Sequence, residues 1–267
     1  TNPTDQQIGS TLWDPVTASL LTFRGNADDA PFGFRVASLD PVSGTARWSV
    51  EIGARIARSP IALDTRRARL YVCPEGFTAH RIDLHSGALS ASLIASDTGT
   101  YSYLALYVPT ADELWFPGLG PTIGTSGGDP VRSKVRIHDA ETLEFRRWLT
   151  HDTYLASATY IPATDEVWLS NGVRCDRFGV PVGSTPVIGA DFRYDDKLRC
   201  VWATSWAADT FTARRIDPVT RAIVWSASYS TSGQPRPVSI ATDDARDEVL
   251  MPLGATLRRY DAATGTY

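Results

Sequence analysis

The sequence predicts an all-β fold, a six-bladed β-propeller formed by residues 1–267 as a single domain. Two landmarks recur along the chain and alternate strictly. The first is a turn that opens with aspartate after a short strand. Its copies start 37 to 56 residues apart, at Asp40, Asp83, Asp139, Asp176, Asp217 and Asp261. The second is a hairpin whose return strand carries large apolar pairs: Leu20-Leu21, Leu70-Tyr71, Leu114-Trp115, Val167-Trp168, Val201-Trp202 and Val249-Leu250. Such a period, with three or four short strands in each unit, is typical of propeller blades.

The stretch 59–87 shows one unit in full. Its apolar runs at 61–63, 70–72 and 77–82 lie between turn residues, and each run is too short for a helix. Aspartate with serine or threonine suits the turn between the third and fourth strands, because these side chains bond to nearby backbone amides. Gly87 supplies the positive φ where the chain reverses.

The blade boundaries follow from these landmarks. Blade six starts near Pro237 and ends straight after its aspartate turn, so we expect the segment Thr1–Ile8 to supply its fourth strand and close the ring. Blade three carries a long insertion, Pro117–Ser133, of the kind that is usually functional or disordered. The other blades are expected over about Gly9–Ile52, Ser59–Ala95, Tyr101–Leu149, Thr153–Val187 and Ala190–Ser230.

Composition excludes several classes of protein. A hydrophobic content of 43% with 21% charged residues is that of a globular protein with a real core. A formal charge of −4 argues against a nucleic-acid partner, and no apolar run is long enough to cross a membrane. Three cysteines cannot form a disulfide framework, so we expect buried free thiols, with a bridge between Cys175 and Cys200 as the alternative. We expect a monomer; a secreted, periplasmic or cytoplasmic location stays open.

The first blade, IGSTLWDPVTASLLTF followed by VASLDPVSGTARW, resembles the opening of the senescence-marker-protein and gluconolactonase family and, more loosely, strictosidine-synthase-like proteins. The resemblance implies a six-bladed propeller. That family holds a divalent metal with a glutamate before the first Trp-Asp pair, two asparagines and an aspartate. Ser10 stands at the glutamate position and the chain has only three asparagines, so we do not expect this metal site. Repeats ending at Trp48 and Trp225 also resemble quinoprotein blades, but no cofactor-contact pattern accompanies them.

Candidate site residues come from the links that form one mouth of a propeller channel, since rigid blades hold such loops in place. His151 is a candidate general acid or base, with Asp152 beside it and Tyr154 nearby. The alternative is a surface histidine with a neighbouring counter-charge. His80, His85 and His138 fall near the opposite end and are expected to be structural.

Substrate-binding candidates reach the same mouth from several blades. Arginines could clamp a carboxylate or phosphate, or each could pair with a local aspartate. Tyrosines could form an aromatic wall or simply fill the channel. The set is Arg55, Arg58, Tyr101, Tyr103, Asn171, Arg193 and Arg236.

The function expected from this set is the binding of a small anionic or polyhydroxylated molecule, by a hydrolase, lyase or cyclase that needs no metal or other cofactor. The alternatives are a non-catalytic propeller, either a glycan-binding lectin or a protein-interaction scaffold, and a calcium-dependent lactonase. Asp28 and Asp29 are the carboxylates that could join a calcium site, although an exposed acidic turn is the commoner explanation. No HExxH, GxGxxG or P-loop motif is present.

Overall fold

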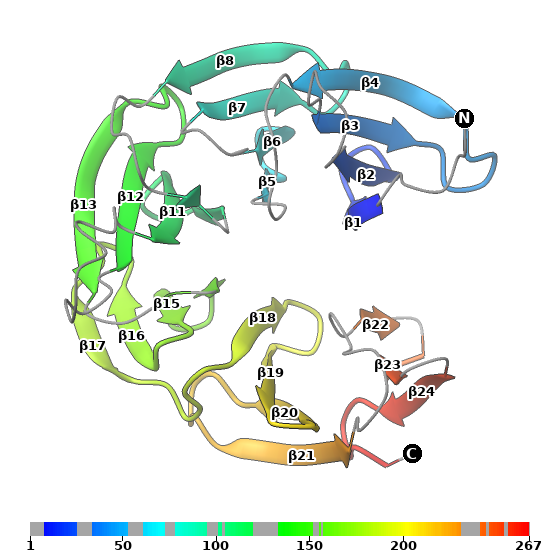
Figure 1. Ribbon diagram of the computed structural model, residues 1–267, viewed down its shortest axis with the longest axis vertical. Helices are drawn as coiled ribbons and strands as arrows, with labels where there is room; N and C mark the ends of the chain where they lie inside the picture. The colour runs from blue at the N-terminus through cyan, green and yellow to red at the C-terminus, as the bar shows by residue number, and fades with distance from the viewer. Residues whose placement is uncertain are drawn as a thin grey trace. The chain divides into compact units, whose positions relative to one another are not determined.

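The chain has an all-β propeller fold (Figure 1), seen in a computed structural model. The structure describes residues 8–25, 34–52, 61–72, 78–94, 101–102, 105–119, 133–151, 155, 157–230, 241–243, 246–253 and 256–266. All regular structure in these ranges is β-strand, and the strands form antiparallel sheets in which chain neighbours pair.

Five sheets contain four consecutive strands each and are complete blades. Blade one consists of β1 (Ile8–Asp14), β2 (Ser19–Gly25), β3 (Phe34–Leu39) and β4 (Ala46–Ile52). Blade two consists of β5 (Ile61–Asp64), β6 (Arg69–Val72), β7 (Thr78–Asp83) and β8 (Leu89–Ile94). Blade three consists of β10 (Leu106–Val108), β11 (Glu113–Leu119), β12 (Ser133–Asp139) and β13 (Phe145–His151), with β9 (Tyr101–Ser102) added beside β11.

Blade four consists of β14 (Ala158–Ile161), β15 (Glu166–Leu169), β16 (Val173–Asp176) and β17 (Pro181–Ser184). Blade five consists of β18 (Asp191–Asp195), β19 (Cys200–Ala207), β20 (Thr210–Ile216) and β21 (Ile223–Ser230). The last sheet has three described strands, β22 (Ala241–Asp243), β23 (Glu248–Leu253) and β24 (Thr256–Asp261). Five complete blades are therefore present where six are predicted. The expected closing segment Thr1–Ile8 lies outside the described residues except for Ile8, which belongs to β1.

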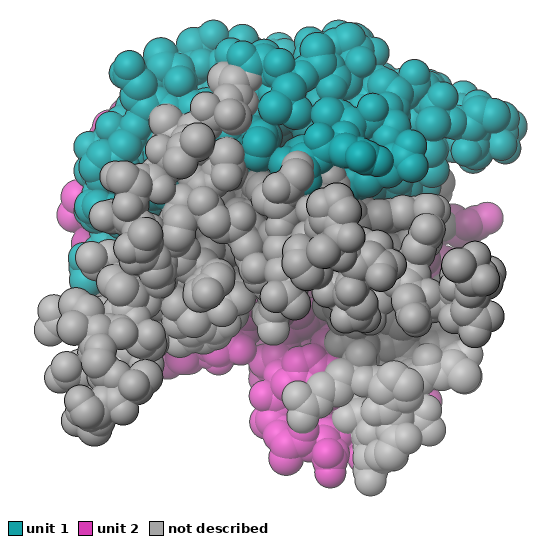
Figure 2. Space-filling view, turned by 45° about the horizontal axis from the view of Figure 1, so that its top comes forward, with its two compact units in different colours: residues 1–156 teal, residues 157–267 magenta. Residues whose placement is uncertain are grey.

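Both sequence landmarks are confirmed in the described strands. Each aspartate turn begins at the end of the third strand of its sheet, and each large apolar pair lies in a second strand. The chain divides into two compact units, residues 1–156 with blades one to three and residues 157–267 with the rest (Figure 2).

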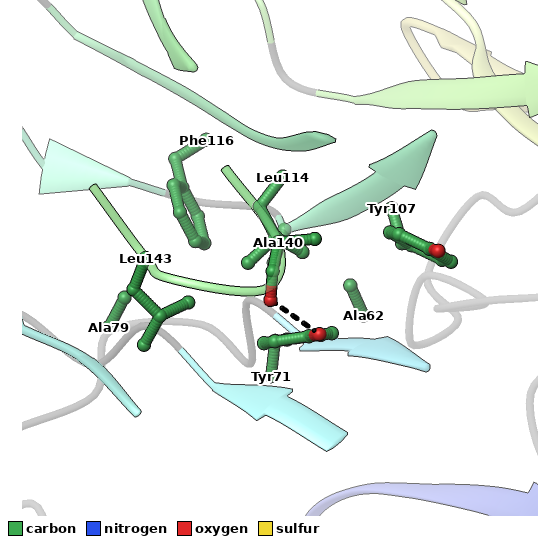
Figure 3. Packing of buried hydrophobic residues seen from close by; sticks show 9 residues of the cluster. Ala62, Tyr71, Ala79, Tyr107, Leu114, Phe116, Ala140 and Leu143 are labelled. Atoms are coloured by element: carbon green, nitrogen blue, oxygen red, sulfur yellow. Dashed lines mark hydrogen bonds between the residues drawn. The ribbon is translucent and has the colours of Figure 1, made fainter. Parts of the chain in front are cut away.

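Within each unit, the core lies between successive blades. Tyr71 of blade two and Leu114 and Phe116 of blade three belong to one such cluster (Figure 3), and the Tyr71 hydroxyl donates to the Ala140 carbonyl across the interface at 2.8 Å. Large second-strand side chains drive this packing because they bury the most apolar area. Trp115, Trp168 and Trp202, each in a second strand, are at most 1% exposed, which confirms their predicted core role.

A second kind of contact also joins neighbouring sheets. Trp48 lies in the fourth strand of blade one, and its indole nitrogen donates a hydrogen bond to the Leu84 carbonyl in the turn of blade two at 2.8 Å. Its ring covers Gly87, where a Cβ atom would lie 2.7 Å from the ring carbons. Trp225 of blade five makes the same contacts with the turn of the last sheet, where Gly265 takes the place of Gly87. Each of these two turns therefore needs glycine for space as well as for its positive φ.

Candidate functional site

The blades have two different ends. At the turn end lie the tight connections between first and second strands and between third and fourth strands. At the loop end lie the connections between second and third strands and the links from one blade to the next. The sequence predicts the candidate ligand site at the loop end.

At the turn end, the aspartates of the repeat hold the backbone. Asp40 accepts hydrogen bonds from the backbone N–H groups of Val42 at 3.0 Å and Ser43 at 2.9 Å through one carboxylate oxygen. The N–H of Ser43 and the guanidinium of Arg47 hold the pKa of Asp40 well below its usual range. Asp217 accepts equivalent bonds from its own turn, which also lower its pKa. These carboxylates are occupied by their turns and are structural.

Arginines at the turn end of blade two are paired with carboxylates of blade three. Arg67 donates to both oxygens of Asp112, with one of these bonds at 3.0 Å, and to Glu141 at 3.0 Å. Its Nε also donates to Asp64 within its own turn at 2.5 Å. Arg69 makes a bidentate contact with Glu141 at 2.5 and 3.1 Å. This cluster fixes two blades together and leaves its guanidinium groups committed to protein carboxylates.

Two Glu-x-Trp segments repeat a second anchor. Glu113 is buried in blade three and accepts a bond from the indole nitrogen of Trp115 at 3.1 Å, together with bonds from Arg146 and Arg147. Glu166 accepts in the same way from the indole of Trp168 at 3.1 Å in blade four. Neither cluster is marked by a known motif, but the repeated glutamate two residues before a core tryptophan is visible in the sequence.

His138 is structural, as predicted. It is fully buried between Phe116 and Phe145, and its Nδ1 lies 2.8 Å from the carbonyl oxygen of Leu143. Burial lowers the pKa of His138 to about 4, so the imidazole is neutral at pH 7. Nδ1 therefore carries the proton and donates a hydrogen bond to the Leu143 carbonyl oxygen.

The cysteines Cys175 and Cys200 are buried free thiols, which confirms the expected state and not the alternative bridge. Burial raises the pKa of each to about 11, so both are poor nucleophiles at neutral pH. Cys73 lies outside the described residues.

At the loop end, blade three places two of the predicted residues in one row across the sheet. Tyr101 of β9 pairs with Leu119, Leu119 pairs with Ser133, and Ser133 pairs with His151 of β13. Three strand spacings separate the backbones of Tyr101 and His151, or about 14 Å. His151 is therefore the last residue of the fourth strand of its blade, at the opposite edge of the sheet from Tyr101. The structure gives the backbone of both residues and not their side chains.

Asn171 lies in the short connection between β15 and β16, at the loop end of blade four. Its side-chain oxygen accepts the backbone N–H of Val173 at 3.1 Å, which closes a local turn. The side-chain amide nitrogen of Asn171 takes no part in this bond and can donate to another group.

Arg193 is exposed on β18, the first strand of blade five, with Asp191 exposed two residues before it and Phe192 buried between them. First strands of neighbouring blades contact each other within a unit, as β14 and β18 do. Asp195, the other predicted local partner of Arg193, accepts bonds from Leu198 at 3.0 Å and from the Trp202 indole at 3.2 Å.

The register shows how unusual Arg193 is. It pairs with Trp202, the core residue of its second strand. The residues that pair with the matching core positions of the other sheets are Leu12, Ala62, Leu106, Thr159 and Ala241. Among these six equivalent positions, Arg193 is the one charged residue.

The remaining predicted site residues, which are Arg55, Arg58, Tyr103, Asp152, Tyr154 and Arg236, lie outside the described residues, as do Asp28 and Asp29. In the described part of the chain, no three histidine, cysteine, aspartate or glutamate side chains gather as metal ligands would. The same part contains no helix that is long and apolar enough to cross a membrane.

Comparison with known proteins adds no family. No protein-family model matches the chain, and no curated protein is significantly similar to it. The resemblance to the senescence-marker-protein and strictosidine-synthase-like families therefore has no support beyond the propeller fold itself.

Proposed function

We propose that this protein is a six-bladed β-propeller, with β22–β24 as its sixth blade, that binds a small anionic organic molecule at the loop end. The observation that carries the proposal is the single charge at Arg193, in a row where the other sheets have small or apolar residues. A guanidinium group on a rigid strand suits a carboxylate or phosphate, which it can hold with two parallel bonds.

The contrast between the two ends supports the same site. Turn-end arginines such as Arg67 and Arg69 are bonded to carboxylates of the neighbouring blade. The predicted site residues differ from one blade to the next: Asn171 lies at the loop end of blade four, whereas Arg193 lies within the first strand of blade five, opposite Trp202. Repeated features stabilise the blades, whereas a set that differs between blades is suited to one asymmetric ligand.

The reaction proposed for this site is hydrolysis, elimination or cyclisation without a metal or other cofactor. His151 would act as general acid or base, with Asp152 and Tyr154 to orient it, because an imidazole titrates near neutral pH. A small molecule is the only partner proposed, with a monomeric protein and neither nucleic acid nor membrane.

Calorimetric titration with a panel of small carboxylates, sugar acids and neutral polyols of equal size tests the binding site. We expect the anions to bind more tightly, and Arg193→Gln to weaken that binding about tenfold through loss of a charge-assisted contact. Arg47→Gln is the matched control, because it removes the same charge from an exposed arginine at the turn end. Equal binding of anions and polyols, or an equal effect of the two variants, would show that the site is misplaced.

Catalysis is tested separately on the ligands that bind. His151→Asn should lower kcat and leave the affinity unchanged, and activity should survive a metal chelator. Loss of activity with chelator would instead favour the calcium-dependent lactonase.

A second candidate function, a protein-interaction scaffold, is favoured by one observation. Blade four exposes apolar side chains along and beside its outer strand, with exposed fractions of 51% at Phe178, 58% at Val180, 47% at Val182 and 74% at Ile188. Exposed apolar groups that gather in this way mark interaction surfaces. If no panel member binds while Val180→Asp and Val182→Asp abolish association with a protein partner, the scaffold function replaces the ligand site.

A further inference from the structure

The short connection between β15 and β16 contains an Asn-Gly pair, Asn171-Gly172, which can modify itself without an enzyme. The glycine nitrogen attacks the Cγ atom of the asparagine side chain, and this approach is open because glycine carries no side chain. Ammonia leaves, a five-membered succinimide forms, and water then opens the ring to aspartate or isoaspartate. Of the three asparagines in the chain, Asn171 alone precedes glycine, since the others precede proline and alanine.

The structure holds the attacking nitrogen in place. The Gly172 N–H donates to the Leu169 carbonyl at 3.0 Å, and the Gly172 carbonyl accepts the Thr185 N–H at 2.8 Å. These two bonds fix the peptide groups on both sides of Gly172. Ring closure requires the Gly172 nitrogen to lose its proton and to approach the Asn171 side chain, so the bond to Leu169 has to break first.

The side chain of Ile188 covers the same glycine. A Cβ atom on Gly172 would lie 2.7 Å from Ile188 Cγ1, and Gly172 has a φ of +91°. Gly172 is buried although Ile188 itself is 74% exposed. Ile188 therefore lies directly on the Gly172 backbone and limits the movement that the attack needs.

One contact acts in the opposite direction. The Val173 N–H donates to Asn171 Oδ1 at 3.1 Å, on the oxygen where negative charge develops during the attack. This bond would stabilise the intermediate, but only after the Gly172 nitrogen has become free to react. The reaction therefore proceeds from an open form of the turn, and the stability of the closed form sets its rate.

We propose that Asn171 is a latent deamidation site, which the Leu169 bond and the Ile188 side chain protect in the folded protein and which local opening of residues 170–172 exposes. Both products carry a negative charge in place of a neutral amide. Isoaspartate also adds one carbon atom to the main chain of a tight turn. Because Gly172 is bonded on both sides, the lengthened chain no longer fits these bonds, and the modified turn stays open.

The test follows deamidation of the full chain by peptide mass spectrometry at mildly alkaline pH, in buffer and in concentrated urea. Replacement of the amide NH2 by OH raises the mass of the peptide that contains Asn171, and chromatography separates isoaspartate from aspartate. Ile188→Ala removes the atoms that lie on Gly172. Val219→Ala is the matched control, because it shortens another exposed apolar side chain, 59% exposed, at the turn end of blade five.

We expect deamidation of Asn171 to be about tenfold slower in buffer than in urea, and Ile188→Ala to accelerate it several-fold in buffer while Val219→Ala leaves it unchanged. In urea, all three proteins should react at the same rate, because the turn is absent there. Circular dichroism shows whether the variants are folded in buffer. Equal rates for the wild type in buffer and in urea overturn the proposal, and so does a folded Ile188→Ala variant that reacts no faster than the Val219→Ala control.

Discussion

The stacking of Trp48 on Gly87 allows a sharp comparison between two glycines with nearly the same backbone. Gly87 and Gly44 have φ values of +74° and +70°, so alanine meets the same backbone strain at both. That strain is about 1 kcal/mol in a left-handed conformation, partly offset by the lower entropy of the unfolded chain. At Gly87 the new methyl group would also lie 2.7 to 2.9 Å from three ring carbons of Trp48.

The indole cannot easily retreat, because its nitrogen is bonded to the Leu84 carbonyl at 2.8 Å. Overpacking of this kind costs about 1–3 kcal/mol, so Gly87→Ala should destabilise the protein by about 2–4 kcal/mol and Gly44→Ala by about 1. For a chain of this size, the difference of about 1–3 kcal/mol corresponds to about 2–12 °C in Tm. Differential scanning calorimetry of the two variants and wild type measures it.

A double-mutant cycle isolates the contact. Trp48→Ala removes the ring, so adding Gly87→Ala to it should cost only about the 1 kcal/mol of backbone strain. Additive effects of the two substitutions, or a Gly44→Ala variant as unstable as Gly87→Ala, would refute the stacking argument. Gly265→Ala offers an independent repeat, since its Cβ atom would lie 2.7 Å from the ring of Trp225.

Two further predictions concern buried polar groups. Because the pKa of His138 is lowered to about 4 in the folded protein and is about 6.5 when unfolded, stability should fall as pH drops from 6.5 towards 4, by up to about 3 kcal/mol. Urea midpoints should show a smaller loss for His138→Asn, and an equal pH dependence would contradict this. Glu113→Ala should cost about 3 kcal/mol because it removes the buried carboxylate that accepts from the Trp115 indole, Arg146 and Arg147. The exposed Glu144→Ala control should change the same midpoint by less than about 0.5 kcal/mol.

Much of the fold could be predicted because its signals are local. Asp40 and Asp217 bond to N–H groups two and three residues ahead, so the sequence alone contains both partners of each contact. The apolar pairs lie in second strands for an equally local reason, since alternation and turn spacing decide which strand is buried. Both landmarks therefore marked strands correctly in all six sheets of the described part of the chain.

Contacts between blades could not be predicted in the same way. Arg67 meets Asp112 and Glu141 across 45 and 74 residues, and nothing near Arg67 in the sequence selects these partners. The candidate site shares this difficulty. The sequence shows that His151 follows the last strand of its blade and so lies at the loop end. It does not show how many strands separate His151 from Tyr101, and the three strand spacings between them place the two backbones about 14 Å apart. The catalytic role of His151 remains a prediction.

The division between the two ends has a consequence for substitutions throughout the chain. Turn-end residues such as Arg67 and Glu113 satisfy one another's charges within the protein, so changing them should lower stability and leave any ligand affinity of the folded fraction unchanged. Arg193 is exposed on the first strand of blade five, and the proposed function predicts that changing it weakens ligand binding more than it lowers stability. A propeller can vary its loops in this manner because the blades are held elsewhere, by the packed second strands and by tryptophans such as Trp48 that join one blade to the next. The proposed ligand site therefore predicts separate effects of such substitutions on stability and on binding.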